Sequence, residues 1–74
     1  MAVCWVRISP DVCRLGATAI YIRERKDDAG DIWHHVYANG RILNSFWSLT
    51  VAKAWTAEKY ENGNFHHYQH YLRL

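Results

Sequence analysis

Cysteine, proline and glycine are all scarce in this chain of 74 residues, which contains two, one and four of them respectively. Cys4 and Cys13 form no CxxC pair and are too few for a disulfide framework, so we expect free thiols, as is usual in the cytosol. A Cys4–Cys13 bridge is the alternative. With 50% apolar residues, the composition excludes a disordered chain and predicts a globular one.

Long apolar runs are missing as well. No stretch approaches the ~20 residues that a membrane-spanning helix needs, and the opening MAVCWVRISP lacks the uninterrupted apolar segment of a signal peptide. We therefore expect one small domain over residues 1–74, located in the cytoplasm and without a membrane partner.

Charge of one sign is not concentrated in any segment. The net charge is +2, with five basic and five acidic residues in 1–37 and four basic against two acidic in 38–74. A nucleic-acid binder usually carries a denser positive stripe. Nucleic acid therefore ranks below protein as the expected partner.

Catalytic motifs are absent too. The chain has no glycine-rich phosphate loop. Cys13, His35 and Asp31 could supply a nucleophile, a base and an orienting group, but the sequence does not predict that they converge in space. We expect a protein that is not an enzyme and that has no cofactor.

Aromatic residues are abundant, with four Trp and five Tyr, and β-branched residues accompany them in strand-like segments. The segment 17–26 favours a strand, although Val12, Leu15, Ala19 and Ile22 also fit helical spacing. Asn39-Gly40 is a strong hairpin signal. The predicted strands are 2–9, 17–26, 32–38 and 41–46, with turns at 9–11 and 26–31, and 17–46 as a three-stranded meander. Residues 9–16 are read as a turn, or as one short helical turn ended by Gly16.

A helix is predicted over residues 48–61, where alanine is frequent and Asn62-Gly63 provides a stop signal. Val51, Ala52 and Trp55 fall on one side of it, and no capping box starts it. The segment 64–74 is read as a strand, with a helix as the alternative. The expected fold class is α+β: an antiparallel sheet of three to five strands with one helix packed on one face.

The histidines decide whether a metal site is expected. Neighbouring strand residues point to opposite faces, so the pairs His34-His35 and His66-His67 cannot each clamp one ion. If 64–74 is helical, His66 and His70 could bind a metal together with a third ligand such as Cys4, Cys13 or His34. We expect no metal, and keep a pH-sensitive interface as a further possibility.

Residues 36–60, VYANGRILNSFWSLTVAKAWTAEKY, loosely resemble double-stranded-RNA-binding domains and sheet-based DNA readers of the AP2 and integrase-arm type. In these families a V-x-x-N-G hairpin precedes an alanine-rich helix, and the resemblance implies binding of duplex or single strands by the sheet face. The lysine cluster of the RNA binders is replaced here by Ser48-Leu49-Thr50-Val51. In its size and lack of motifs, the chain also resembles in style small phage accessory proteins of the anti-CRISPR type, which inhibit a host machine by binding it.

These observations predict a non-enzymatic binding module with a protein partner, and a nucleic-acid-binding domain as the alternative. A homodimer is possible if aromatic side chains such as Tyr21, Trp5 and Tyr71 remain on an uncovered sheet face. The predicted contact residues are Arg23, Arg25, Trp33, His35, Tyr37, Arg41 and Tyr71.

Overall fold

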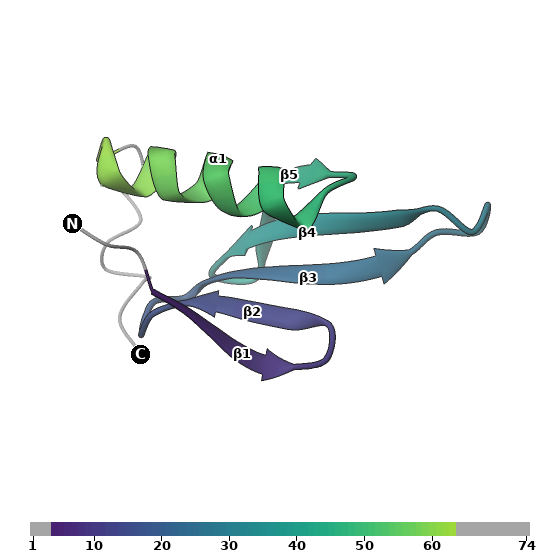
Figure 1. Cartoon of the computed structure of the whole chain (residues 1–74), viewed down its shortest axis with the longest axis horizontal. Helices are drawn as coiled ribbons and strands as arrows, with labels where there is room; N and C mark the ends of the chain where they lie inside the picture. The colour runs from purple at the N-terminus through teal and green to yellow at the C-terminus, as the bar shows by residue number, and fades with distance from the viewer. Residues whose placement is uncertain (1–3, 64–74) are drawn as a thin grey trace.

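The computed structural model describes residues 4–63, which form an antiparallel sheet with one helix on one face (Figure 1). Each of the five strands is hydrogen-bonded to the next along the chain. The elements are β1 (Trp5–Ser9), β2 (Val12–Leu15), β3 (Ile20–Lys26), β4 (Ile32–Ala38), β5 (Arg41–Phe46) and α1 (Leu49–Glu61). The predicted α+β class, with three to five strands and a helix near 48–61, is confirmed.

The longest ladder of the sheet joins β3 to β4. Its seven cross-strand pairs continue without a break along both strands. Because side chains alternate along a strand, this register puts Ile20 and Ile22 on the same face as Val36 and Ala38. These four side chains are buried and form the centre of the core. The predicted strand, rather than a helix, is confirmed over Ile20–Lys26, whereas residues 17–19 of the predicted range 17–26 belong to the turn before it.

The β4–β5 hairpin turns at Asn39-Gly40 as predicted. Both residues have positive φ, 52° and 83° respectively, which is what a type I′ turn requires and what Asn and Gly tolerate. The twist of that turn matches the twist of the flanking strands, so it sets the register at which β5 returns along β4.

The strand β2 was not predicted. Residues 12–15 were expected to belong to a turn or a short helical turn, but they pair with both β1 and β3. The physical reason is the tight turn at Pro10 and Asp11, where Asp11 Oδ1 accepts a hydrogen bond from Ser9 Oγ at 2.7 Å. This turn reverses the chain within two residues, and Gly16, with φ of 52°, ends the new strand.

The helix α1 packs on the sheet through the side that carries Ala52 and Thr56. Ala52 and Thr56 are fully buried, and the Phe46 and Trp55 rings lie 5.5 Å apart between sheet and helix. The expectation that Val51 joins this buried stripe is wrong, because the side chain is 51% exposed. Thr56 takes its place, since i and i+4 positions share one helix face; its hydroxyl donates to Ala52 O at 2.8 Å.

Ile22→Val tests the face assignment of β3. Ile22 is 1% exposed, so loss of one methylene from the core should lower the free energy of unfolding by about 0.5–1.5 kcal/mol. Urea unfolding measures this as a lower midpoint at an unchanged slope. The matched control is Ile42→Val, because Ile42 is 54% exposed; an equal loss in both variants would contradict the assignment.

Val51→Glu should stabilise α1. Ser48 already caps the helix by accepting a hydrogen bond from Val51 N, and the first turn has no acidic residue. A glutamate at 51 completes a capping box and places negative charge at the positive end of the helix dipole, for a gain of about 0.5–1 kcal/mol. The thermal midpoint should rise. Val51→Gln separates the two effects, because it retains the hydrogen bond without the charge.

Candidate binding face

One face of the sheet is left uncovered by α1 in the part of the chain that the structure describes (Figure 1). We call it the open face and define it by the strand side chains that alternate away from the helix. From β3, β4 and β5 they are Tyr21, Arg23, Arg25, Trp33, His35, Tyr37, Ile42 and Ser45; β2 adds Val12 and Arg14, and β1 adds Val6.

The β3–β4 register arranges these side chains in rows. Tyr21 lies opposite Tyr37, Arg23 opposite His35, and Arg25 opposite Trp33. Successive rows are about 7 Å apart, which is twice the rise per residue of a strand. Each row thus combines a β3 ring or guanidinium group with an aromatic side chain of β4.

Ring contacts hold the open face in a defined shape. Tyr21 and Tyr37 stack with their centroids 4.8 Å apart and their planes within 7° of parallel. The guanidinium carbon of Arg23 lies 5.9 Å from the centre of the Tyr21 ring. His35 meets Tyr37 edge to face at 6.3 Å, and its Nδ1 is hydrogen-bonded to Ser45 Oγ at 2.6 Å. These neighbours restrict the rotamers of the side chains.

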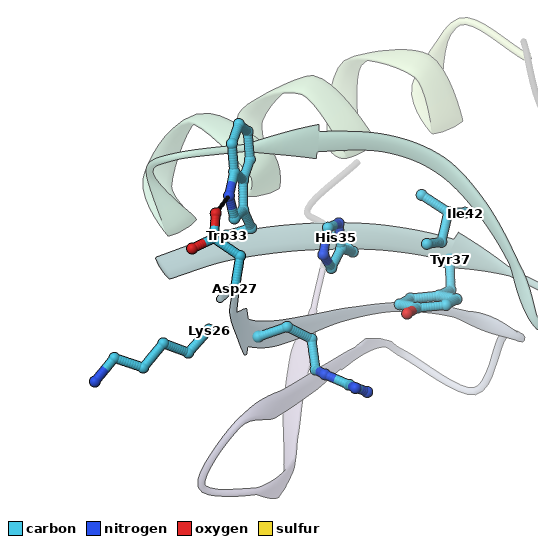
Figure 2. A pocket seen from close by; sticks show the side chains of 7 residues that line it. Lys26, Asp27, Trp33, His35, Tyr37 and Ile42 are labelled. Atoms are coloured by element: carbon cyan, nitrogen blue, oxygen red, sulfur yellow. Dashed lines mark hydrogen bonds between the residues drawn. The ribbon is translucent and has the colours of Figure 1, made fainter. Parts of the chain in front are cut away.

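A cavity of about 300 Å³ opens on the same face, as Figure 2 shows. This volume is at the lower end of the range for ligand pockets. Its wall combines apolar side chains, two cationic side chains and the Asp27 carboxylate. The lining residues are Arg25, Lys26, Asp27, Trp33, His35, Tyr37 and Ile42.

Asp27 ties the β3–β4 turn to the open face. Its carboxylate accepts hydrogen bonds from Trp33 Nε1 at 2.9 Å, Asp31 N at 2.9 Å and Ala29 N at 3.0 Å. These bonds, that of the Trp33 indole first, hold the pKa of the Asp27 carboxyl below its ordinary value of 3.8. The Asp27 carboxylate is therefore held by hydrogen bonds within the protein and stays negatively charged, and the Trp33 ring is fixed at the edge of the cavity (Figure 2).

Trp47 was missed by the sequence analysis. It lies between β5 and α1, is 74% exposed, and meets Trp33 edge to face at 5.3 Å. Its position directly before the Ser48 cap is where a hydrophobic staple usually packs onto the helix. A tryptophan that remains exposed at this position instead extends the aromatic surface beside the open face.

The structure brings together five of the predicted contact residues. Arg23, Arg25, Trp33, His35 and Tyr37 all lie on the open face. Whether they contact a partner stays a prediction.

The expectations that Arg41 and Trp5 lie on the open face are corrected, and the expectation on Tyr71 lies outside the described residues. Arg41 is opposite the buried Ala38, so it leaves the sheet on the side away from the open face. Trp5 packs against the core beneath Lys53, whose Nζ lies 5.8 Å from the ring centre. The register of β5 on β4 places Arg41, and the register of β1 on β2 places Trp5. Tyr71 belongs to the segment 64–74, which the structure does not describe.

The His34-His35 pair separates onto opposite faces, as strand alternation predicts. His34 is buried, 9% exposed, on the helix side, whereas His35 belongs to the open face. Cys4 is exposed and Cys13 buried, and both thiols are free. Residues 4–63 contain no group of three His, Cys, Asp or Glu that could hold a metal ion. The hypothesis that uses His66 and His70 lies outside the described residues.

A second hollow lies on the helix side of the sheet, but its volume is only about 10 Å³. That is about the space of one water molecule, far below the volume of a ligand pocket. It is lined by Arg7, Asp11, Cys13, Ile22, Glu24, His34 and Leu49. The cavity of the open face is therefore the larger of these two hollows.

Fold and site together define a small α+β domain with an aromatic and basic sheet face. No helix of the described residues is long and apolar enough to cross a membrane. Comparison with protein-family models, curated proteins and solved structures finds no match to this chain.

The Asp27–Trp33 hydrogen bond predicts an acid titration. Because the folded-state pKa of Asp27 lies below 3.8, the stabilisation by its carboxylate is present above about pH 4 and lost as the pH falls through the folded-state pKa. The NMR signal of the Trp33 indole N–H should follow this titration with a midpoint below 3.8. It should not do so in Asp27→Asn, and the Trp5 indole signal is the internal control. A Trp33 midpoint at or above 3.8 contradicts the assignment.

Proposed function

We propose that this protein is a non-enzymatic binding module that docks its open face onto a protein partner. The observation that carries the proposal is the exposed apolar surface near the Tyr21–Tyr37 stack and the cavity. Trp47 and Ile42 are 74% and 54% exposed, respectively. Ile42 lines the cavity together with Arg25, and Trp47 contacts the Trp33 ring of the cavity wall edge to face. Exposed apolar surface with this composition is typical of interaction sites.

The side chains of the open face are those that dominate binding energy in protein complexes. Trp, Tyr and Arg are enriched at interface hot spots. The stacked Tyr21 and Tyr37 and the hydrogen-bonded Trp33 are already held in place before a partner arrives. Binding then loses less side-chain entropy, which favours affinity.

A docked module covers the surface that it binds. Docking of this kind would inhibit a host machine by covering its surface. Small phage accessory proteins of the anti-CRISPR type act in this way. The proposal requires no catalytic group and no cofactor.

A nucleic-acid-binding domain is the second candidate, and one observation favours it: Arg23 and Arg25 lie among aromatic rings, a combination that single-stranded nucleic acids bind. Two features favour a protein instead. Tyr21 and Tyr37 stack on each other, so each ring has one face covered and less surface left to stack a base. The turn after β3 carries Asp27, Asp28 and Asp31, which repel a phosphate backbone.

Affinity capture with paired tyrosine variants tests the proposal. Tagged protein should retain a discrete partner from nuclease-treated extract of its native host, and Tyr37→Ala should weaken binding of that purified partner by about 30-fold or more. The matched control is Tyr60→Ala, because Tyr60 is also partly exposed but lies on α1. Equal binding by both variants contradicts the proposal.

The nucleic-acid alternative is tested by titrating labelled duplex and single-stranded oligonucleotides at about 50 and about 200 mM salt. Affinity that falls steeply with salt, and that Tyr37→Ala or Arg25→Ala removes, supports the alternative and argues against a protein partner. Absence of binding at both salt concentrations removes it.

A further inference from the structure

We infer that the open face recognises an extended acidic segment of its partner, with carboxylates at alternate positions seated on Arg23 and Arg25. The inference rests on the proposed function and adds the chemistry of the partner. Three observations support the inference: the charges on the open face, the hydrogen-bonding state of Arg23, and the spacing between Arg23 and Arg25.

The charged strand side chains on the open face are all basic. They are Arg14, Arg23 and Arg25, whereas Glu24 between the last two lies on the opposite face, across from His34. The carboxylate of Asp27 at the end of the face is occupied by its three hydrogen bonds. Asp27 keeps its negative charge at one end of the face, and the pKa of Asp11 is lowered first by the Ser9 hydrogen bond and also by the charges of Arg23 and Arg25. The positive charge is therefore local to the arginines, and a complementary partner segment carries negative charge opposite them.

Arg23 has unused hydrogen-bonding capacity. Its Nε is buried and has no hydrogen-bond partner in the part of the chain that the structure describes. The guanidinium group is held over the Tyr21 ring, and a cation–π contact is less directional than a hydrogen bond. It can therefore turn toward a carboxylate, which accepts two parallel N–H bonds from one guanidinium group.

The spacing of the two arginines matches an extended chain. Arg23 and Arg25 are alternate residues of β3, so they leave the sheet about 7 Å apart. Alternate residues of an extended segment have the same separation and point to the same side. Acidic residues at i and i+2 thus each meet one arginine, whereas neighbouring acidic residues point to opposite sides. Helical neighbours at i and i+4 are closer, about 5–6 Å apart.

The cavity gives space to the carboxylate that meets Arg25. The cavity, of about 300 Å³, is lined by the charged side chains of Arg25, Lys26 and Asp27 and by the apolar surfaces of Trp33, Tyr37 and Ile42. An aspartate or glutamate side chain can therefore place its carboxylate at the arginine and its methylene groups against the rings. A second copy of this protein fits less well, because in a two-fold contact the open face meets its own copy, and the strand side chains of that face carry no carboxylate.

Selection from a displayed library of random peptides tests the inference with the full chain as bait. Asp and Glu at positions i and i+2 should be enriched about tenfold or more over the unselected library and over acidic residues at i and i+1. The charge-reversed Arg25→Glu variant should lose this preference and select Lys or Arg instead. Circular dichroism and thermal unfolding establish that each variant is folded.

Arg41→Glu is the matched control, because it makes the same charge change on the other side of the sheet. It should keep the acidic preference, and equal loss in both variants overturns the inference by showing that net charge alone governs selection.

Enrichment of apolar peptides without acidic residues, removed by Tyr37→Ala, also overturns the inference but leaves the proposed function intact. Oligonucleotides that displace the selected peptides overturn it in favour of the nucleic-acid alternative. If no selected peptide depends on the open face, the inference fails, and the capture experiment decides the proposed function separately.

Discussion

The unbroken register between β3 and β4 is the constraint on which the rest of the structure depends. Because side chains alternate with a period of two, a slip of one residue would exchange the core and the open face along the whole ladder. The turn after β3, which closes on the Asp27 carboxylate, holds this register. Asn39-Gly40, with the positive φ angles of a type I′ turn, sets the register of the next ladder, between β4 and β5. The β3–β4 register is the reason why Ile22 is buried and its neighbour Arg23 faces outward.

The second constraint is size. One helix of 13 residues covers one face of a five-stranded sheet, so among the described residues the other face relies on contacts between its own side chains. The Tyr21–Tyr37 stack and the hydrogen bond from Trp33 to Asp27 provide these contacts. The same contacts order the surface that we propose for binding, so stability and recognition depend on shared residues.

The two candidate ligand classes, an acidic protein segment and a nucleic acid, differ in how their negative charge is distributed. A phosphate backbone is charged at every nucleotide, whereas a peptide can present carboxylates only where guanidinium groups meet them. The open face has arginines in its middle and aspartates at the β3–β4 turn. A partner with charge at selected positions matches that pattern better than one with uniform charge.

The amino-acid sequence by itself determined the features that depend on neighbouring residues: the alternation that separates His34 from His35, the Asn39-Gly40 hairpin, the helix near 48–61 and the grouping of Arg23, Arg25, Trp33, His35 and Tyr37 on two adjacent strands. Only the tertiary structure decided that residues 12–15 form a strand, that Thr56 rather than Val51 is buried, that Trp5 packs on the core, that Arg41 points away from the open face and that Trp47 stays exposed. Each of these depends on which strand pairs with which and on where the helix lies on the sheet. Such contacts join residues that are distant in the chain, and local periodicity contains no information about them.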